Sequence, residues 1–469
     1  MKLTRPVPKL PHSYFWTWDH STNWVLDDPG TMNFGCQNRY LKKPDTFVED
    51  YRRLTDFAAD IGIEGIAIWG FLRDSHHGIE GAKRVASYGA EKGVRIMPGV
   101  GTSQYGGVYY EGEHPYNLDT LLRDQPQRAA IAPEWIREDG QVHSLCPSHP
   151  QFAEWIQEGM EWLFRTFEIG GCNLENGDFF RCFCPSCREK YEHRQDGDSE
   201  FFHFQKLGYE AAFNAAKKIQ ENNAKELLIT WATYCGFVPG GAPDATDLMY
   251  TPQMHCQRPS IFQAHPEHTV QWSLTGMIHQ TPLPLYHFWE DGTPSVSTER
   301  WPEGLTPPSQ HNVGYLHQGS QWCHIPRYEL AISSIKEGCL CAWKVGFEGV
   351  VIQGEVTPQH IPTLLNYLAF SHFTHWPEDS IRRFGMVTLG EVLGSERAGE
   401  VYARGLCELE RTPRDQDCIQ QVFEEYQKVY PLIMMGNREK LSGQLIRFQM
   451  WNWLYKAMNG ERGANWPFY

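Results

Sequence analysis

The sequence has no long apolar segment and comparatively few basic residues. No stretch approaches about 18 consecutive apolar residues, so we expect no membrane helix. The first residues have a basic start but lack the apolar stretch of a secretory signal, which favours a cytoplasmic location unless a signal was trimmed. Lys and Arg number 42 against 57 Asp and Glu, a formal net charge of −15. Because phosphate contacts need basic clusters, we expect no nucleic-acid partner.

Several motifs of other enzyme classes are also absent. No Gly-x-Gly-x-x-Gly follows a candidate strand and no Walker A sequence occurs, which argues against nucleotide-binding folds. No Gly-x-Ser-x-Gly elbow supports a serine hydrolase, and no His-Glu-x-x-His supports a zinc protease. We therefore expect no organic cofactor. The 13 cysteines are an odd number in a chain long enough to form a core without disulfides.

The sequence does contain a repeated alternation of short apolar runs and helical patterns. After the first run, Phe47, Tyr51, Leu54, Ala58 and Ile61 recur at the spacing of one helix face. The candidate strands are 13–19, 65–71, 94–100, 171–175, 227–233, 248–251, 268–274, 312–318 and 349–353. About eight such units predict an α/β fold, a (β/α)₈ TIM barrel with long insertions after its strands.

The end of the chain is helical throughout and differs from the alternating part. We expect residues 1–376 to form the catalytic barrel and residues 377–469 to form a helical C-terminal extension packed on it. The extension could be a lid, a simple packing element or a dimer surface, so a homo-oligomer stays open.

The aromatic content is high, with 17 Trp, 21 Tyr and 25 Phe. One interpretation is a large core, and the other is a cleft that stacks sugar rings on indoles. In a (β/α)₈ barrel, chemistry lies at the carboxyl ends of the strands. The residues that follow the predicted strands are therefore candidates for carbohydrate binding: Trp16, Trp18, His20, Trp69, Trp231, Tyr234, Trp272, His317 and Trp322.

Carboxylates follow the same strands. Cleaving a glycosidic bond needs one carboxyl group to protonate the leaving oxygen and a second as nucleophile or base. Glu175 ends a buried strand, where desolvation raises a carboxyl pKa, and is the predicted acid. Glu355 is the predicted base or nucleophile, and Asp19 and Asp178 are predicted helpers. The alternatives are a helix-capping Glu175, an interior salt bridge of Glu355 and an Asx turn at Asp178.

The strand count adds a stereochemical expectation. If Glu175 and Glu355 follow the fourth and eighth strands, they face each other across the barrel mouth. That arrangement favours the wider carboxyl spacing of roughly 6.5–9.5 Å and hence inversion.

Three cysteines lie within six residues at Cys182, Cys184 and Cys187. This spacing is typical of a metal knuckle, and Cys146, Cys172 or His193 could supply a fourth ligand. The expected ion is one structural Zn²⁺ that holds the loop after Glu175. The alternative is three reduced cysteines that pack in the core.

The segments 172–178 and 182–187, with 354–377 at the last barrel unit, resemble parts of known glycoside hydrolases. They are distantly similar to family 67 α-glucuronidases, family 20 β-hexosaminidases and related bacterial barrel proteins. The resemblance implies a TIM barrel and places Glu175 at the position of the family acid. The chain has Leu174-Glu175 where family 20 enzymes have an Asp-Glu pair, and no uronate-gripping basic residues are recognisable.

The predicted function is therefore glycoside hydrolysis on a Trp-lined barrel face, with a carbohydrate substrate. One alternative is a metal-dependent sugar isomerase, epimerase or lyase. Its metal ligands would come from His20, His76, His77 and His317, with Asp19 or Glu355. Another is a non-catalytic carbohydrate-binding barrel, in which Glu175 and Glu355 would not face one cleft.

Overall fold

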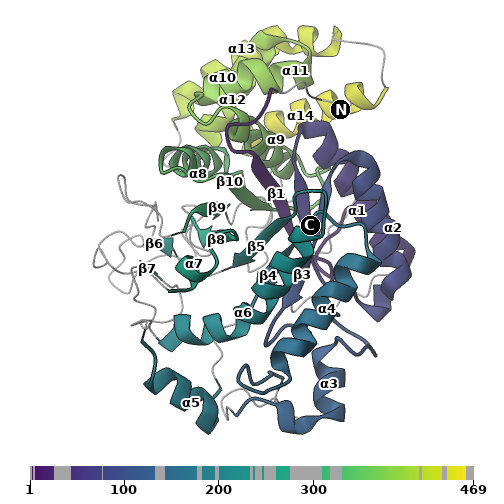
Figure 1. The fold of residues 1–469 in the computed structure, drawn as a ribbon. Helices are drawn as coiled ribbons and strands as arrows, with labels where there is room; N and C mark the ends of the chain where they lie inside the picture. Colours follow the sequence, from purple (N-terminus) through teal and green to yellow (C-terminus); the bar gives the residue numbers. More distant parts are fainter. Residues whose placement is uncertain are drawn as a thin grey trace.

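A computed structural model describes most of the chain. The described residues are 3, 6–25, 44–76, 78–131, 143–176, 182–195, 200–232, 236–237, 246–247, 260–274, 309–316, 330–410, 415–435 and 441–460. Eight strands, all paired in parallel, close into a barrel in the order β1-β10-β9-β8-β5-β4-β3-β2 (Figure 1). The fold predicted from the sequence, a (β/α)₈ TIM barrel, is therefore confirmed.

The barrel strands start and end close to their predicted positions. They are β1 (His12–Trp18), β2 (Gly65–Trp69), β3 (Arg95–Gly101), β4 (Gly171–Glu175), β5 (Leu228–Ala232), β8 (Thr269–Ser273), β9 (His311–Leu316) and β10 (Gly349–Gln353). β6 (Gly236–Phe237) and β7 (Thr246–Asp247) form a separate antiparallel pair. The predicted strand 248–251 lies outside the described residues.

β2 is shorter than predicted, and the cause is local. Gly70 has a φ of 84°, which takes the chain out of extended geometry directly after Trp69. A Cβ at residue 70 would lie 2.0 Å from Asp19 Oδ1, so only glycine allows this approach.

Helices surround the barrel. They are α1 (Pro44–Ile61), α2 (Gly78–Lys92), α3 (Leu118–Asp124), α4 (Phe152–Thr166), α5 (Pro185–Glu192), α6 (Glu200–Glu221), α7 (Ser260–Ala264), α8 (Ile332–Lys344) and α9 (Ile361–His375). The predicted helix face after the first strand is buried in α1, with Tyr51, Leu54 and Ile61 all at 0% exposure. Short 3₁₀ turns span Asp74–His76 and Pro126–Arg128.

The end of the described chain is helical, as expected. The elements are α10 (Ile381–Phe384), a π-helical turn (Gly385–Leu389), α11 (Gly390–Leu393), α12 (Glu396–Glu410), α13 (Gln416–Met435) and α14 (Leu441–Met458). Figure 1 shows these helices together beside α8 and α9, away from α3 and α5. The predicted domain boundary at residue 376 stays a prediction.

Side chains of the strands alternate between the barrel interior and the layer under the helices. On β4, Cys172 and Leu174 join the core under the helices, whereas Asn173 points inward. Glu175 continues the inward series at the carboxyl end of the strand, because successive strand residues face opposite sides. The alternation therefore decides which side chains reach the barrel mouth.

A hydrogen-bond network fills the barrel interior below the mouth. Asn173 Oδ1 accepts from the indole N–H groups of Trp69 at 2.9 Å and Trp16 at 3.3 Å. Its Nδ2 donates to Thr230 Oγ1 at 2.8 Å and to Gln271 Oε1 at 3.1 Å. All of Asn173's polar atoms are thus bonded, which avoids the cost of burying unpaired polar groups.

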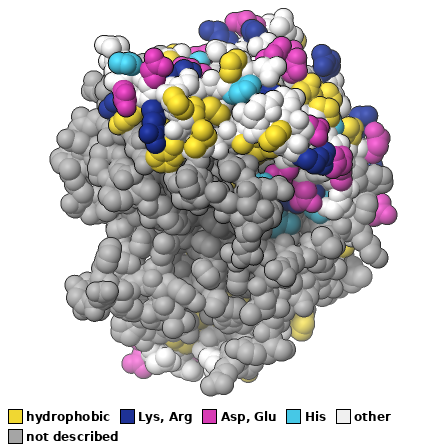
Figure 2. Space-filling model, turned by 90° about the horizontal axis from the view of Figure 1, so that it is seen from below, with side chains coloured by type: hydrophobic (Ala, Val, Ile, Leu, Met, Phe, Trp, Pro, Cys, Tyr) yellow, Lys and Arg dark blue, Asp and Glu magenta, His cyan; other side chains and the backbone are white. Residues whose placement is uncertain are grey.

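The described surface carries mixed charges. In Figure 2, acidic, basic and apolar side chains are interspersed over the part of that face that is described. Within the described residues, no helix is long and apolar enough to cross a membrane.

Candidate active site

Glu175 and Glu355 lie at the carboxyl ends of opposite strands. In the ring of eight strands, three others separate β4 from β10 in either direction. Glu175 is the last residue of β4, and Glu355 comes two residues after β10. Both side chains are nearly inaccessible, with residue exposures of 2% and 0%. The two glutamates predicted as a pair therefore follow opposite strands at the carboxyl end of the barrel.

The carboxylate of Glu355 is held by the turn that follows β1. Its Oε1 accepts the backbone N–H of Trp18 at 3.0 Å and the hydroxyl of Ser21 at 2.6 Å. The backbone carbonyl of Glu355 accepts the N–H of Asn23 at 2.8 Å. Both of these donors to Oε1 are neutral, and they orient the carboxyl group.

Neutral groups also fix the chain around Glu175. Its carbonyl accepts the N–H of Thr102 at 2.9 Å. The next residue, Asn176, accepts the hydroxyls of Thr102 at 2.6 Å and Ser103 at 3.0 Å through Oδ1. The N–H of Asn176 donates to Tyr209 Oη at 2.9 Å. The end of β4 is therefore joined to the loop after β3 and to α6.

Aromatic rings form the inner surface near the mouth. Trp18 lies 5.4 Å from Trp16 and 5.5 Å from Trp69 between ring centroids. Tyr105 adds a ring 6.1 Å from Trp18, and Tyr110 one at 5.9 Å. Trp16, Trp18 and Trp69 were predicted from the sequence as sugar-binding residues, and the structure brings them together in one cluster.

Tyr105 has an unusual backbone conformation in this cluster. Its φ of 54° makes it the only non-glycine residue with positive φ in the described part of the chain. Such strain costs on the order of 1–3 kcal/mol and occurs preferentially at functional sites. It directs the Tyr105 ring toward Trp18 and Trp69.

Asp19 lies in a different environment, within an ionic cluster. Its carboxylate contacts Arg73 Nε at 2.9 Å, His76 Nδ1 at 2.6 Å and His20 Nδ1 at 3.2 Å. Burial raises the pKa of Asp19, but the Arg73 charge and hydrogen bonds from both histidines hold it well below its usual range. Arg73 also pairs with Glu111. Asp19 is thus an ionised anchor for Arg73 and the histidines, which makes proton donation an unsuitable role for it.

Two of the predicted sugar-stacking residues face away from the barrel interior. The Trp231 ring lies 5.0 Å from Tyr209 and 5.4 Å from Phe213, both on α6. The Trp272 indole N–H donates to Asn312 at 2.8 Å, and its ring joins the core under the helices. Thr230 and Gln271, which precede them on the strands, point into the barrel. Because successive strand residues face opposite sides, both indoles point outward toward the helices. We exclude them from the candidate sugar platform.

Other predicted site residues cannot be placed. Asp178, Tyr234, His77, His317 and Trp322 lie outside the described residues. The predicted His20 is 7% exposed, and its ring lies 5.4 Å from Trp18. It therefore borders the aromatic cluster.

The sequence interpretation omitted several residues at the mouth. Tyr315 lies 5.9 Å from Trp16 and accepts a hydrogen bond from Gln353 Nε2 at 3.1 Å. Tyr110 packs under Arg73, whose guanidinium carbon is 4.6 Å from the ring centroid. Inward alternation along β9 was the signal that could have identified Tyr315.

A cavity of ≈ 320 Å³ lies at the opposite, amino end of the strands. Its lining includes His12, Arg95, His311 and Glu348. Arg95 pairs with Glu64 at 2.9 Å, and His311 pairs with Glu348 at 2.8 Å. These groups neutralise one another, as expected at the end of a barrel that contributes to stability.

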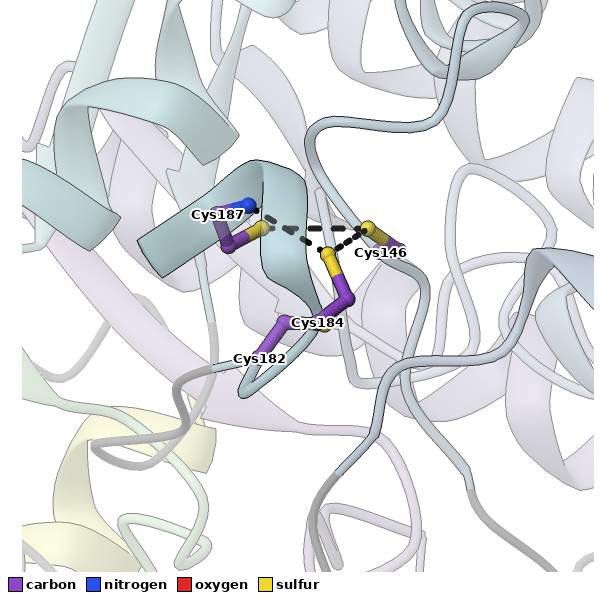
Figure 3. Close-up of side chains that lie close together, drawn as sticks. All are labelled: Cys146, Cys182, Cys184 and Cys187. Atoms are coloured by element: carbon purple, nitrogen blue, oxygen red, sulfur yellow. Dashed lines mark hydrogen bonds between the residues drawn. The ribbon is translucent and has the colours of Figure 1, made fainter. Parts of the chain in front are cut away.

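Four cysteines form a cluster beside the β4 side of the mouth. The Sγ atoms of Cys146, Cys182, Cys184 and Cys187 all lie within 4.8 Å of one another (Figure 3). Of the proposed fourth members, Cys146 is the one in the cluster. Cys172 lies in β4 on its helix-facing side, and His193 caps the end of α5.

The histidines proposed as metal ligands are arranged differently. Among the described residues, ligand atoms gather within 4.8 Å at the four cysteines and at His265, Glu267 and His268. Asp19, His20 and His76 do not form such a group, because the Arg73 guanidinium occupies the Asp19 oxygens. The ligand set of the isomerase alternative is therefore not assembled in this part of the chain.

No protein-family profile matches the chain, and no curated protein sequence does. Solved structures that are distantly similar to it include glycoside hydrolases. A GH138 enzyme targeting pectin rhamnogalacturonan II has 8% identity and a TM-score of 0.47, over 97% of this chain and 58% of its own. The α-amylase from Geobacillus thermoleovorans has 10% identity and a TM-score of 0.42, over 78% of each chain.

A third similar structure is α-L-fucosidase isoenzyme 2 from Paenibacillus thiaminolyticus. It has 10% identity and a TM-score of 0.41, over 77% of this chain and 49% of its own. The chain thus spans about half to three fifths of the GH138 and fucosidase chains. Similarity at this level does not indicate which reaction or which sugar belongs to this chain.

Proposed function

We propose that this chain is a glycoside hydrolase that uses Glu175 and Glu355 on an aromatic barrel face. The observation that carries the proposal is the position of these two carboxyl groups on opposite strands of the barrel mouth. Two carboxyl groups across a substrate cleft are what glycosidic cleavage requires. The rings of Trp16, Trp18, Trp69 and Tyr105 beside them suit the apolar face of a sugar.

The two glutamates have different roles in this proposal. Glu175 protonates the leaving oxygen as the bond to the anomeric carbon breaks. Glu355 activates a water molecule on the opposite face of the sugar, oriented by the donors from Trp18 and Ser21. Because β4 and β10 are opposite strands, we expect the wide carboxyl spacing and inversion at the anomeric carbon.

The first test is hydrolysis of a panel of aryl glycosides, including uronides and N-acetylhexosaminides. We expect Glu175→Gln and Glu355→Gln to lower kcat/KM by about 10²–10⁴-fold with the fold intact, as for loss of a general acid or base. Glu378→Gln is the matched control, because its exposed side chain pairs only with Lys9 at 2.9 Å on the surface. Retained turnover in both active-site variants would remove these glutamates from the mechanism.

Leaving-group dependence separates the two roles. A dinitrophenyl glycoside has a leaving group that needs no protonation, so we expect Glu175→Gln to hydrolyse it at close to the wild-type rate. Glu355→Gln should stay slow on the same substrate. The anomer released first, observed by NMR, tests inversion independently. If no glycoside in the panel or among oligosaccharides is cleaved, a carbohydrate-binding barrel replaces the enzyme proposal.

A further inference from the structure

The four-cysteine cluster has the dimensions of a mononuclear metal site. Cys146 Sγ lies 3.6 Å from Cys184 Sγ and 3.8 Å from Cys187 Sγ (Figure 3). Zinc bound at about 2.3 Å to four tetrahedral sulfurs places those sulfurs about 3.8 Å apart. A disulfide would need about 2.05 Å, and these cysteines are free. An iron–sulfur cluster distributes its four cysteine sulfurs over two or four iron atoms, so the set as a whole is wider than this one.

Two separate segments supply the sulfurs. Cys182 and Cys184 lie in the short segment that leads into α5, where Cys184 is the N-cap residue, and Cys187 lies in the first turn of α5. Cys146 comes from the segment before α4, on the far side of the cluster. The N–H of Cys187 points at Cys184 Sγ at 3.3 Å, and the N–H of Ile131 points at Cys182 Sγ at 3.3 Å. Backbone donors of this kind stabilise thiolates and orient them as ligands.

The surroundings of the cluster are mostly apolar, although Cys184 is partly exposed and Ser148 Oγ lies 3.0 Å from Cys187 Sγ. Cys182 and Cys187 are 1% and 0% exposed, and Cys146 is 7% exposed. Ala130, Phe183, Phe204 and Leu207 pack around them. Four thiolates so close in an apolar enclosure repel one another unless a cation neutralises them. Four sulfur ligands also leave no open position, which is typical of a structural site and not of a catalytic one.

We propose that Cys146, Cys182, Cys184 and Cys187 bind one Zn²⁺ ion in a closed tetrahedral site. The ion holds the 182–187 loop against the segment that contains Cys146. All-sulfur tetrahedral coordination of a single ion is a preferred arrangement of zinc.

This site is connected to the end of β4 through one backbone and one side-chain hydrogen bond. Leu145, next to Cys146, donates its N–H to the carbonyl of Ser103 at 2.9 Å. The Ser103 hydroxyl donates to Asn176 at 3.0 Å, and Asn176 follows Glu175. Metal binding therefore stabilises the loop after β3 and, through Asn176, the position of the Glu175 backbone. This consequence is separate from the proposed reaction, because the metal itself contacts no substrate.

The test is the metal content of the full-length protein, purified without chelator and measured by inductively coupled plasma mass spectrometry. We expect one zinc per chain in the wild type and less than a tenth of that in Cys146→Ser and Cys187→Ser. Cys341→Ser is the matched control, because Cys341 is a partly buried cysteine of α8 outside the cluster and the variant should keep the zinc. Metal-free wild type, or zinc retained by both cluster variants, would overturn the proposal.

A second measurement uses only the wild type, in case the variants do not fold. Titration with an organomercurial that reacts with thiols should release zinc, detected by a metallochromic dye, as four thiols react. Cobalt(II) exchanged into the protein should show the thiolate-to-cobalt charge-transfer bands of tetrahedral sulfur coordination. Zinc release that does not follow thiol modification, or octahedral cobalt spectra, would contradict a four-cysteine site. Iron in place of zinc would overturn the choice of ion.

Discussion

The two walls of the barrel mouth use opposite electrostatics. On the β1–β2 wall, the Asp19 carboxylate pairs with the Arg73 guanidinium and also contacts the rings of His76 and His20. On the β4 and β10 walls, Glu355 Oε1 accepts from the Trp18 N–H and the Ser21 hydroxyl, and the Glu175 carbonyl accepts from the Thr102 N–H, all of them neutral donors. All three acidic residues are buried to 2% exposure or less.

Burial alone therefore does not identify a catalytic acid. An acid that is paired with an arginine stays ionised and acts as an anchor, because its proton is too costly to bind. An acid held by neutral donors is oriented without such pairing and can exchange a proton during a reaction. We therefore expect Asp19 to contribute mainly to stability, and catalysis by Glu175 and Glu355 stays a proposal.

The largest effect should follow from removing the ion pair between Arg73 and Asp19. Arg73→Met leaves the Asp19 carboxylate buried without its main cation, and we expect a loss of about 3–5 kcal/mol in the free energy of unfolding. Urea denaturation followed by tryptophan fluorescence measures it. Arg52→Met is the control, because its 44% exposed side chain pairs with Glu49 on the surface and should cost at most about 1 kcal/mol. Equal losses in both variants would show that the cluster around Asp19 adds no special stability.

The contribution of the Asp19 carboxylate should also appear in the pH dependence of stability, with a smaller effect. Because the folded pKa of Asp19 is depressed, its stabilisation is full above the unfolded pKa of about 3.9 and is lost as pH falls toward the folded pKa. The advantage of the wild type over Asp19→Asn should shrink below pH 3.9 by up to about 1.4 kcal/mol per pH unit. Urea denaturation between pH 2.5 and pH 7, roughly spanning the unfolded carboxyl pKa, measures this change.

Asp45→Asn provides the control for that series, because the Asp45 side chain is 92% exposed. It should differ little from the wild type at every pH. A difference between wild type and Asp19→Asn that stays constant down to the lowest pH would contradict the assignment of Asp19 as a permanently ionised anchor.

The sequence predicted the barrel because each strand is a short apolar run between helical patterns. Because these runs are apolar on both faces, the sequence did not indicate whether each indole points into the barrel or toward the helices. Trp231 and Trp272 occupy strand positions next to Thr230 and Gln271, and those polar residues mark the inward face. Only the interior network around Asn173 reveals that polar side chains, as well as aromatic ones, fill this barrel.

Contacts between residues far apart in the sequence could not be predicted, for a different reason. Asp19 and Arg73 are 54 residues apart, and nothing local indicates that Gly70 lets their strand ends approach. The same applies to the fourth cysteine, which spacing alone could not choose among Cys146, Cys172 and His193. Glu175 and Glu355 were predicted because the carboxyl ends of the strands are fixed by the fold class itself. Their catalytic roles stay predictions.

The smallest effect should come from removing one neutral hydrogen-bond donor to Glu355. Ser21→Ala removes the 2.6 Å hydrogen bond to Glu355 but keeps the backbone donor from Trp18. We expect a loss of about 1.4 kcal/mol, equivalent to a tenfold lower kcat/KM on the best glycoside, because the carboxylate is less well oriented. Thr22→Val removes a neighbouring hydroxyl that bonds to the Trp18 carbonyl at 2.7 Å. Thr22→Val should lower the free energy of unfolding about as much as Ser21→Ala does. It should change kcat/KM by no more than about twofold.

The pair of variants separates orientation of Glu355 from general loosening of the turn after β1. If the two variants lower kcat/KM equally, the turn acts only as a structural support. The contacts of Glu355 would then have the same structural role as those of Asp19. If only Ser21→Ala does so, the hydroxyl acts through the carboxyl group it contacts. Ser21→Thr, which keeps a hydroxyl, should then recover most of the lost activity, because the required feature is a neutral donor at Glu355 Oε1.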